Sequence, residues 1–173
     1  MNGVVWRPAE KSDRALLERF CCTAGDGPEY EHVVQRYFRA QAIRHAGAVD
    51  SLRADHRLLL LFETDVLVGV ACHRRGDSPM VRQLAFAAIH IDYQGRSLTN
   101  GKRASDTLWE VIVNDLLARP GVAPITIVAR VHPDNARSLG FCSRIGLDPI
   151  EVDGHGLMIC AGPLPPTPTI EGI

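Results

Sequence analysis

The feature of this sequence that most restricts its fold is a helical segment enclosed by two strand-like segments. Residues 81–92 alternate their side chains as the two faces of a strand do, and residues 124–131 (PITIVARV) form a short β-branched run. Between them, residues 104–118 place Asp106 and Glu110 four positions apart on a polar stripe, which is typical of a largely buried helix. Because a helical crossover joins the two strands, they are predicted to run parallel in one sheet.

The remaining segments add antiparallel strands and further helices. Two apolar runs, residues 58–62 and 66–71, are separated by a tight connection and predict a hairpin. The other expected strands are residues 4–7, 147–152 and 156–161, and the other expected helices are residues 29–46, residues 135–145 with Gly146 as the C-cap, and a helix that begins after Ser12 or Asp13 and ends near Phe20. The prediction is an α+β fold with a mixed, mostly antiparallel sheet of about seven strands and about four helices, in the order β-α-α-β-β-β-α-β-α-β-β.

Composition limits the domain organisation and the partners. A chain of 173 residues and 19.0 kDa suits one domain, expected over residues 1–162, with a Pro/Thr-rich tail at 163–173 that we expect to be disordered. Its 19 basic and 20 acidic residues give a net charge of -1, which argues against a surface built to grip nucleic acid or an anionic membrane. A homodimer is compatible with this composition.

The cysteines indicate the compartment. There are five, an odd number, and Cys21 and Cys22 are adjacent, which argues against a disulfide framework and favours a reducing cytosol. No apolar run approaches the length of a membrane span, and the polar N-terminus does not read as a signal peptide. We therefore expect a cytoplasmic protein that is not bound to a membrane.

The link between the fourth strand and the long helix is rich in Gly, Ser, Asn and Arg. A loop of small residues that enters a helix presents backbone N–H groups at the positive end of the helix dipole, which suits a phosphate or pyrophosphate. Arg96, Lys102 and Arg103 would add full positive charges there. The competing interpretation is a solvated loop with an ordinary helix cap at Ser105.

Two separated segments resemble the GNAT superfamily of N-acetyltransferases. Residues 89–96 (IHIDYQGR) look like the family's V-x-P-x-Y-R-G-K, and residues 135–147 (NARSLGFCSRIGL) look like its N-x-x-S/A-x-x-x-Y-x-x-x-G-F. The order of elements agrees over residues 4–161. The resemblance implies acetyl-CoA as the acyl donor, its pyrophosphate held by a Q/R-x-x-G-x-G/A loop and its pantetheine in a splay between the fourth and fifth strands.

That loop motif can be placed in two registers in this chain. It fits residues 94–97 directly after the strand, or residues 100–105 directly before the helix, as if about six residues had been inserted. The second register is preferred, because amides at the helix start are the physical requirement. The cofactor-binding residues that follow from the resemblance are Ile89, Ile91, Arg96, Gly101, Lys102, Arg103, Ala104, Ser105, Asn135 and Ser138.

The catalytic groups are less well defined. Cys142 stands where many family members carry a Tyr that protonates the leaving thiolate, although a buried structural thiol is the competing interpretation. His90 is the candidate base, and His73 on the preceding strand is a weaker candidate; the competing interpretation is that a histidine in a strand is more often a packed, hydrogen-bonded residue. The backbone amides of Ile89 and Ile91 are the candidate oxyanion donors.

Three carboxylates, Asp26, Glu29 and Glu31, fall where the family lines its acceptor pocket and could attract a cationic amine. The alternative is an ordinary acidic helix N-terminus. No C-x-x-C or H-E-x-x-H spacing for a metal and no G-x-S-x-G elbow for a hydrolase occurs in the sequence.

The expected function is acetyl-CoA-dependent transfer of an acetyl group to an amine of a small molecule, peptide or protein, by direct attack on the thioester. A different class remains open: a catalytically idle acyl-CoA-binding module that acts as a sensor or partner protein, suggested by the missing Tyr. A plain interaction domain is disfavoured, because two motifs stand in the correct order.

Overall fold

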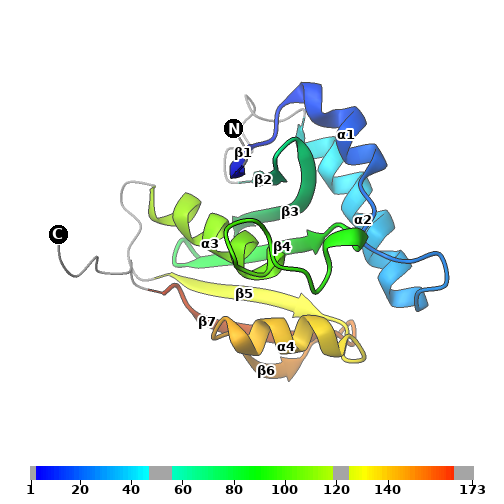
Figure 1. The fold of residues 1–173 in the computed structure, drawn as a ribbon. Coiled ribbons are helices and arrows are strands. Elements are labelled where there is room, and N and C mark those ends of the chain that lie inside the picture. The colour runs from blue at the N-terminus through cyan, green and yellow to red at the C-terminus, as the bar shows by residue number, and fades with distance from the viewer. Residues whose placement is uncertain (1–2, 47–55, 119–124, 166–173) are drawn as a thin grey trace.

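The computed structural model describes residues 3–46, 56–118 and 125–165 (Figure 1). They form a seven-stranded sheet in the order β1-β2-β3-β4-β5-β7-β6, in which β4 and β5 pair in parallel and every other pair is antiparallel. The strands are β1 (Val4–Pro8), β2 (Arg57–Glu63), β3 (Val66–Arg75), β4 (Val81–Ile89), β5 (Thr126–Val131), β6 (Asp148–Val152) and β7 (Met158–Pro163). The helices are α1 (Arg14–Arg19), α2 (Glu29–Ala46), α3 (Ala104–Leu117) and α4 (Ala136–Arg144), with short 3-10 turns at Lys11–Asp13 and Ile91–Tyr93. The predicted fold class and element order are confirmed.

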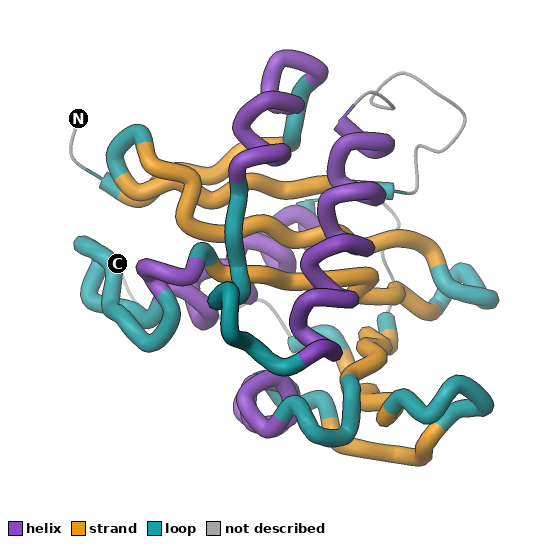
Figure 2. Tube along the Cα trace, turned by 90° about the vertical axis from the view of Figure 1, so that its right-hand side faces the viewer, coloured by secondary structure: helices purple, strands orange, loops and turns teal. Residues whose placement is uncertain are grey.

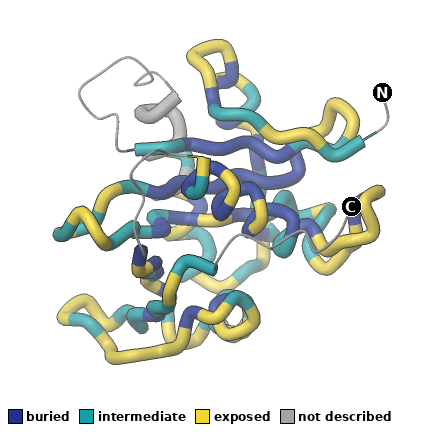
Figure 3. The backbone as a smooth tube through the Cα atoms, turned by 90° about the vertical axis from the view of Figure 1, so that its left-hand side faces the viewer, coloured by how far each residue is buried: buried dark blue, intermediate teal, exposed yellow. Residues whose placement is uncertain are grey.

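Helices cover both faces of the sheet (Figure 2). On one face, Leu17 of α1 packs with Leu58 and Leu60 of β2; on the other, Leu108 of α3 packs with Leu59. Successive residues of a strand point to opposite faces, so a strand covered on both sides needs an unbroken apolar run. This explains the four consecutive leucines. Burial is greatest along the central strands, whereas the edge strand β6 is exposed throughout (Figure 3).

Several expected boundaries change. The strand predicted over residues 81–92 ends at Ile89, and His90 instead caps the following 3-10 turn, its Nδ1 accepting the N–H of Asp92 at 3.3 Å. Gly146 has φ of 79°, as its predicted C-cap role requires. Strand β7 includes Pro163, one residue past the expected domain end, and residues 166–173 lie outside the described residues.

Strands β4 and β5 separate part of the way along their length. They pair only from Val81 opposite Thr126 to Leu84 opposite Ala129. Ala85 is bulged against β3, because Leu84 and Phe86 pair with the consecutive residues His73 and Cys72. A bulge bends and twists its strand, so β4 continues to Ile89 with one edge open.

Among the described residues, no helix is both long enough and apolar enough to cross a membrane.

Candidate active site

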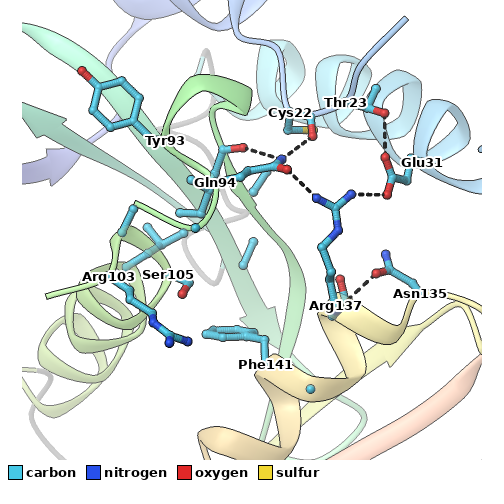
Figure 4. A pocket seen from close by; sticks show the side chains of 18 of the residues that line it. Cys22, Thr23, Glu31, Tyr93, Gln94, Arg103, Ser105, Asn135, Arg137 and Phe141 are labelled. Carbon is cyan, nitrogen blue, oxygen red and sulfur yellow. Dashed lines mark hydrogen bonds and ion pairs between the residues drawn. The ribbon is translucent and has the colours of Figure 1, made fainter. Parts of the chain in front are cut away.

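A cavity of about 460 Å³ lies where β4 leaves β5 (Figure 4). Its walls come from segments far apart in the sequence. Cys22, Thr23, Glu31 and Val34 of the α1–α2 region form one side, the end of β4 with Ala87, Ala88 and Ile89 forms the floor, and the starts of α3 and α4 form the other sides. The size falls within the range of small-molecule sites, about 300–1,000 Å³.

The loop before α3 enters the cavity in two pieces. Gln94 and Gly95 line it, and so do Arg103, Ala104 and Ser105, whereas the residues between them do not. We call these five lining residues the split loop. The intervening residues form a hairpin closed by a bridge between Ser97 and Arg103, with the Ala104 N–H donating to the Arg96 carbonyl at 3.2 Å. Each of the two predicted registers therefore supplies part of the wall.

This hairpin corrects three cofactor-binding predictions. Gly101 lies at its tip, and its N–H donates to the Leu98 carbonyl at 2.8 Å. The Lys102 N–H donates to Asn100 Oδ1 at 3.0 Å. Gly101, Lys102 and the exposed Arg96 are not among the lining residues.

The start of α4 lies where the sequence predicted. Asn135 is its N-cap, with Oδ1 accepting the Ser138 N–H at 3.0 Å, and both residues line the cavity. The cap fixes the first turn of α4 beside the open edge of β4.

The two candidate oxyanion amides differ. The His90 N–H donates to Val68 O at 2.9 Å, so Ile89, one residue earlier, directs its N–H to the opposite, open edge of β4. The Ile91 N–H is already bound to the Cys21 carbonyl at 2.9 Å, and Ile91 does not line the cavity. The prediction for Ile91 is therefore wrong, while Ile89 keeps the required position.

Cys142 belongs to the core. It is 3% exposed and is not part of the cavity wall, which is formed instead by its neighbour Phe141. Burial, and then the adjacent Cys160 thiol, raises the pKa of Cys142 to about 12. A thiol that holds its proton this tightly is a poor donor toward an ordinary thiolate. The position and the chemistry both disagree with a catalytic acid and agree with the structural interpretation.

The candidate histidine bases also lie elsewhere. His90 packs edge-on against Phe20, with ring centroids 5.6 Å apart, and does not line the cavity.

His73 is 1% exposed, and its Nε2 lies 2.9 Å from Asp115 Oδ2. Arg57 Nη2 lies 2.6 Å from the other carboxylate oxygen. Burial alone would raise the pKa of Asp115, but the hydrogen bonds from His73 and Arg57 outweigh it and hold this pKa well below its usual range. These three residues join β3, β2 and α3 as a structural cluster.

Of the three candidate acceptor carboxylates, only Glu31 lines the cavity. Its Oε2 accepts the Thr23 hydroxyl at 2.8 Å, and its side chain is 14% exposed. Asp26 and Glu29 are exposed outside the cavity, and Glu29 pairs with Arg36 at 2.7 Å. Their expected role is therefore not supported: Asp26, in the turn before α2, and Glu29, at the start of α2, are both exposed.

Sequence reasoning missed Arg137. Its guanidinium donates to Gln94 Oε1 at 2.8 Å and to Glu31 Oε1 at 2.7 Å, and thus connects α4, the split loop and α2 across the cavity (Figure 4). Gln94 is itself fixed by donating from Nε2 to Cys22 O at 2.7 Å. Nothing local in the sequence signals the Arg137–Glu31 pair, because 106 positions separate the two residues.

No family model and no curated protein matches this chain. Solved structures do match it. The PaiA N-acetyltransferase from Thermoplasma acidophilum, in complex with coenzyme A, is 16% identical over 92% of this chain and 98% of its own, with a TM-score of 0.69. The acetyltransferase of the GNAT family from Streptococcus pneumoniae is 18% identical over 94% and 99% of the two chains, with a TM-score of 0.59. The ribosomal-protein-S18-alanine N-acetyltransferase from Escherichia coli is 15% identical over 98% and 99%, also at 0.59.

These comparisons define the class of fold. The chain has the GNAT N-acetyltransferase fold, which confirms the resemblance that its two motifs carried.

Proposed function

We propose that this protein transfers the acetyl group of acetyl-CoA to an amine nitrogen. The observation that carries the proposal is the cavity itself, which joins the open edge of β4 to the N-terminal starts of α3 and α4. An open strand edge offers backbone hydrogen-bonding groups to an amide-containing arm, and helix starts favour anions.

The lining residues fit the two ends of the donor. Arg103 of the split loop stands at the α3 start, and Arg144 of α4 reaches the first turn of α3, where its Nη2 lies 2.9 Å from Asp106 Oδ1. Two guanidinium groups beside a helix N-terminus suit a diphosphate. Ala87 and Ala88 provide a narrow apolar floor on which a thioester arm can lie.

The proposed reaction is a direct transfer. The substrate ammonium loses one proton to water, and its nitrogen attacks the acetyl carbonyl carbon; the N–C bond forms as the C–S bond breaks. The nitrogen then loses a second proton, the leaving thiolate gains one, and one proton is released overall. The Ile89 N–H is placed to stabilise the carbonyl oxygen as it becomes negative. With Cys142 in the core, water protonates the thiolate.

The second candidate is an acyl-CoA-binding module without turnover. The specific observation in its favour is that Cys142, at the position of the family's acid, is buried outside the cavity. We also propose a cytoplasmic location for either activity. All five cysteines are free thiols in the structure, and free thiols persist in a reducing compartment.

Calorimetric titration with coenzyme A, followed by an assay of free thiol released from acetyl-CoA in the presence of amines of different classes, tests the proposal. We expect binding, a raised melting temperature and amine-dependent thiol release. Binding without release for every amine would favour the binding module. Absence of binding would refute both.

A further inference from the structure

Glu31 and Arg137 form an ion pair within the wall of the cavity, and its two members differ in exposure. The Glu31 side chain is 14% exposed and is held through both oxygens, by Thr23 and by Arg137. The Arg137 side chain is 69% exposed. Because the Arg137 guanidinium is largely solvent-exposed, this ion pair contributes little to stability, and a ligand cation can take the place of Arg137 beside Glu31 at small cost.

The charges around the cavity make this pair distinctive. Among the described lining residues, Glu31 is the only carboxylate, and Arg103, Arg137 and Arg144 are the cations. Arg103 and Arg144 belong to the α3 side. Arg137 instead reaches Gln94 and Glu31, toward the α2 side (Figure 4).

A substrate that carried only an ammonium group would compete with Arg137 for Glu31 and would leave the guanidinium without its carboxylate. A substrate that also carried a carboxylate would give Arg137 a new partner. The guanidinium has five N–H donors, and its hydrogen bonds within the described residues use two of them, so a bidentate contact to a carboxylate is available.

Besides the ion pair, this end of the cavity is lined by the polar side chains of Thr23 and Gln94 and by smaller apolar ones. Cys22 and Val34 lie beside Glu31 in the lining, and the whole cavity of about 460 Å³ must also hold the donor's arm. This favours a free small molecule over a folded protein surface.

We propose, building on the acetyl-transfer function above, that the acceptor is a small amino-acid-like zwitterion whose ammonium group binds Glu31 and whose carboxylate binds Arg137. The two groups thereby set which amines are accepted. Arg137 is then a specificity residue that contacts the substrate. When the substrate binds, the ion pair between Arg137 and Glu31 is replaced by two ion pairs, one from each residue to the substrate.

The test compares each common α-amino acid with its own carboxamide, which keeps the amine and the side chain and loses the negative charge. We expect at least one amino acid whose kcat/KM exceeds that of its amide by tenfold or more. Arg137→Gln should remove this difference by lowering kcat/KM for the acid tenfold or more, whereas kcat/KM for the amide should not fall, because its ammonium group no longer competes with Arg137 for Glu31; Arg137→Lys should restore part of the difference. Arg36→Gln is the matched control, because Arg36 is an exposed arginine that pairs with Glu29 outside the cavity.

Coenzyme A affinity and melting temperature are measured for every variant. If Arg137→Gln lowers the affinity for coenzyme A by the same factor as it lowers kcat/KM for the amino acid, Arg137 binds the donor and the proposal is wrong. Acetylation of the amides as efficient as that of the acids also refutes it, as does turnover of neither set by a protein that binds coenzyme A and acetylates amines of another class. These results are distinct from failure of the acetyl-transfer function, in which coenzyme A does not bind or no amine of any class is acetylated.

Discussion

Lys102 and Arg103 are neighbours in the chain, but their side chains serve different surfaces. Lys102 Nζ lies 2.6 Å from Glu110 Oε1 on the exposed side of α3, whereas Arg103 lines the cavity beside Phe141 (Figure 4). The cause is the hairpin, which closes at Arg103 and there returns the chain to the start of α3, whereas Lys102 still belongs to the hairpin loop.

Arg103→Ala should therefore weaken the binding of coenzyme A, whereas Lys102→Ala should not. Removing a charged hydrogen-bond donor costs about 1.5–3 kcal/mol, roughly 10- to 100-fold in Kd. Calorimetry at low salt measures both variants. Equal weakening by the two substitutions would mean that general positive charge, and not the split loop, attracts the phosphates.

Cys142→Ala should lower stability and leave the turnover number of the folded protein unchanged. The thiol is buried in the core, and its pKa is raised to about 12, so it neither reaches the cavity nor gives up its proton readily. Chemical denaturation and kcat measured on the same preparation give the two readouts. An inactive variant with an unaltered unfolding midpoint would restore Cys142 as a catalytic candidate.

Asp115 should make the free energy of unfolding depend on pH in the acidic range. Its pKa in the folded protein lies below the ordinary value of 3.8, so the stabilisation is fully present above that value and is lost as the pH falls through it toward the folded pKa. At neutral pH, Asp115→Asn should cost about 3 kcal/mol, because it leaves the buried His73 and the partly buried Arg57 without their counter-charge.

Urea denaturation between about pH 7 and pH 3 measures this, and the variant should lose less stability on acidification than the wild type. Glu110→Gln provides the control on the same helix, since the pair that Glu110 forms with Lys102 is exposed. Parallel pH curves for Asp115→Asn and the wild type would show that the cluster does not carry this titration.

Gly162→Ala should be destabilising for a steric reason. A Cβ on Gly162 would clash with the backbone carbonyl of Gly146, where the chain leaves α4, and backbone has little room to yield. Overpacking of this kind costs about 1–3 kcal/mol. Gly154→Ala is the control, because a Cβ there meets no atom within 4 Å. Thermal unfolding compares the two; equal midpoints would show that β7 can move away.

Hydrophobic periodicity was sufficient to predict the fold. Residues 29–46 were expected as a helix and form α2 over the same range, and the crossover between β4 and β5 follows from the helical period of α3. Periodicity failed at His90, where the alternation continues in the sequence but the strand ends. There the Ile91 N–H bonds to Cys21, a long-range contact that no local pattern encodes.

The site was harder to predict for the same reason. Asn135 and Ser138 lie on one helical turn, so their spacing alone places them together. Glu31 and Arg137 meet only because α2 and the start of α4 approach the end of β4 from opposite sides. The split loop was found only in part, because a motif read along the chain cannot show which residues a hairpin brings back together.

Because Ser97 and Arg103 are bridged to each other, the number of residues in the hairpin between them does not determine the shape of the cavity wall. The entropic cost of lengthening a closed loop grows only with the logarithm of its length. Relatives of this chain can therefore gain or lose residues at the hairpin tip during evolution while Arg96 stays hydrogen-bonded to Ala104. Sequence comparison that requires fixed spacing will score such insertions as a lost motif, so the proximity of these two residues in space is the better mark of common descent.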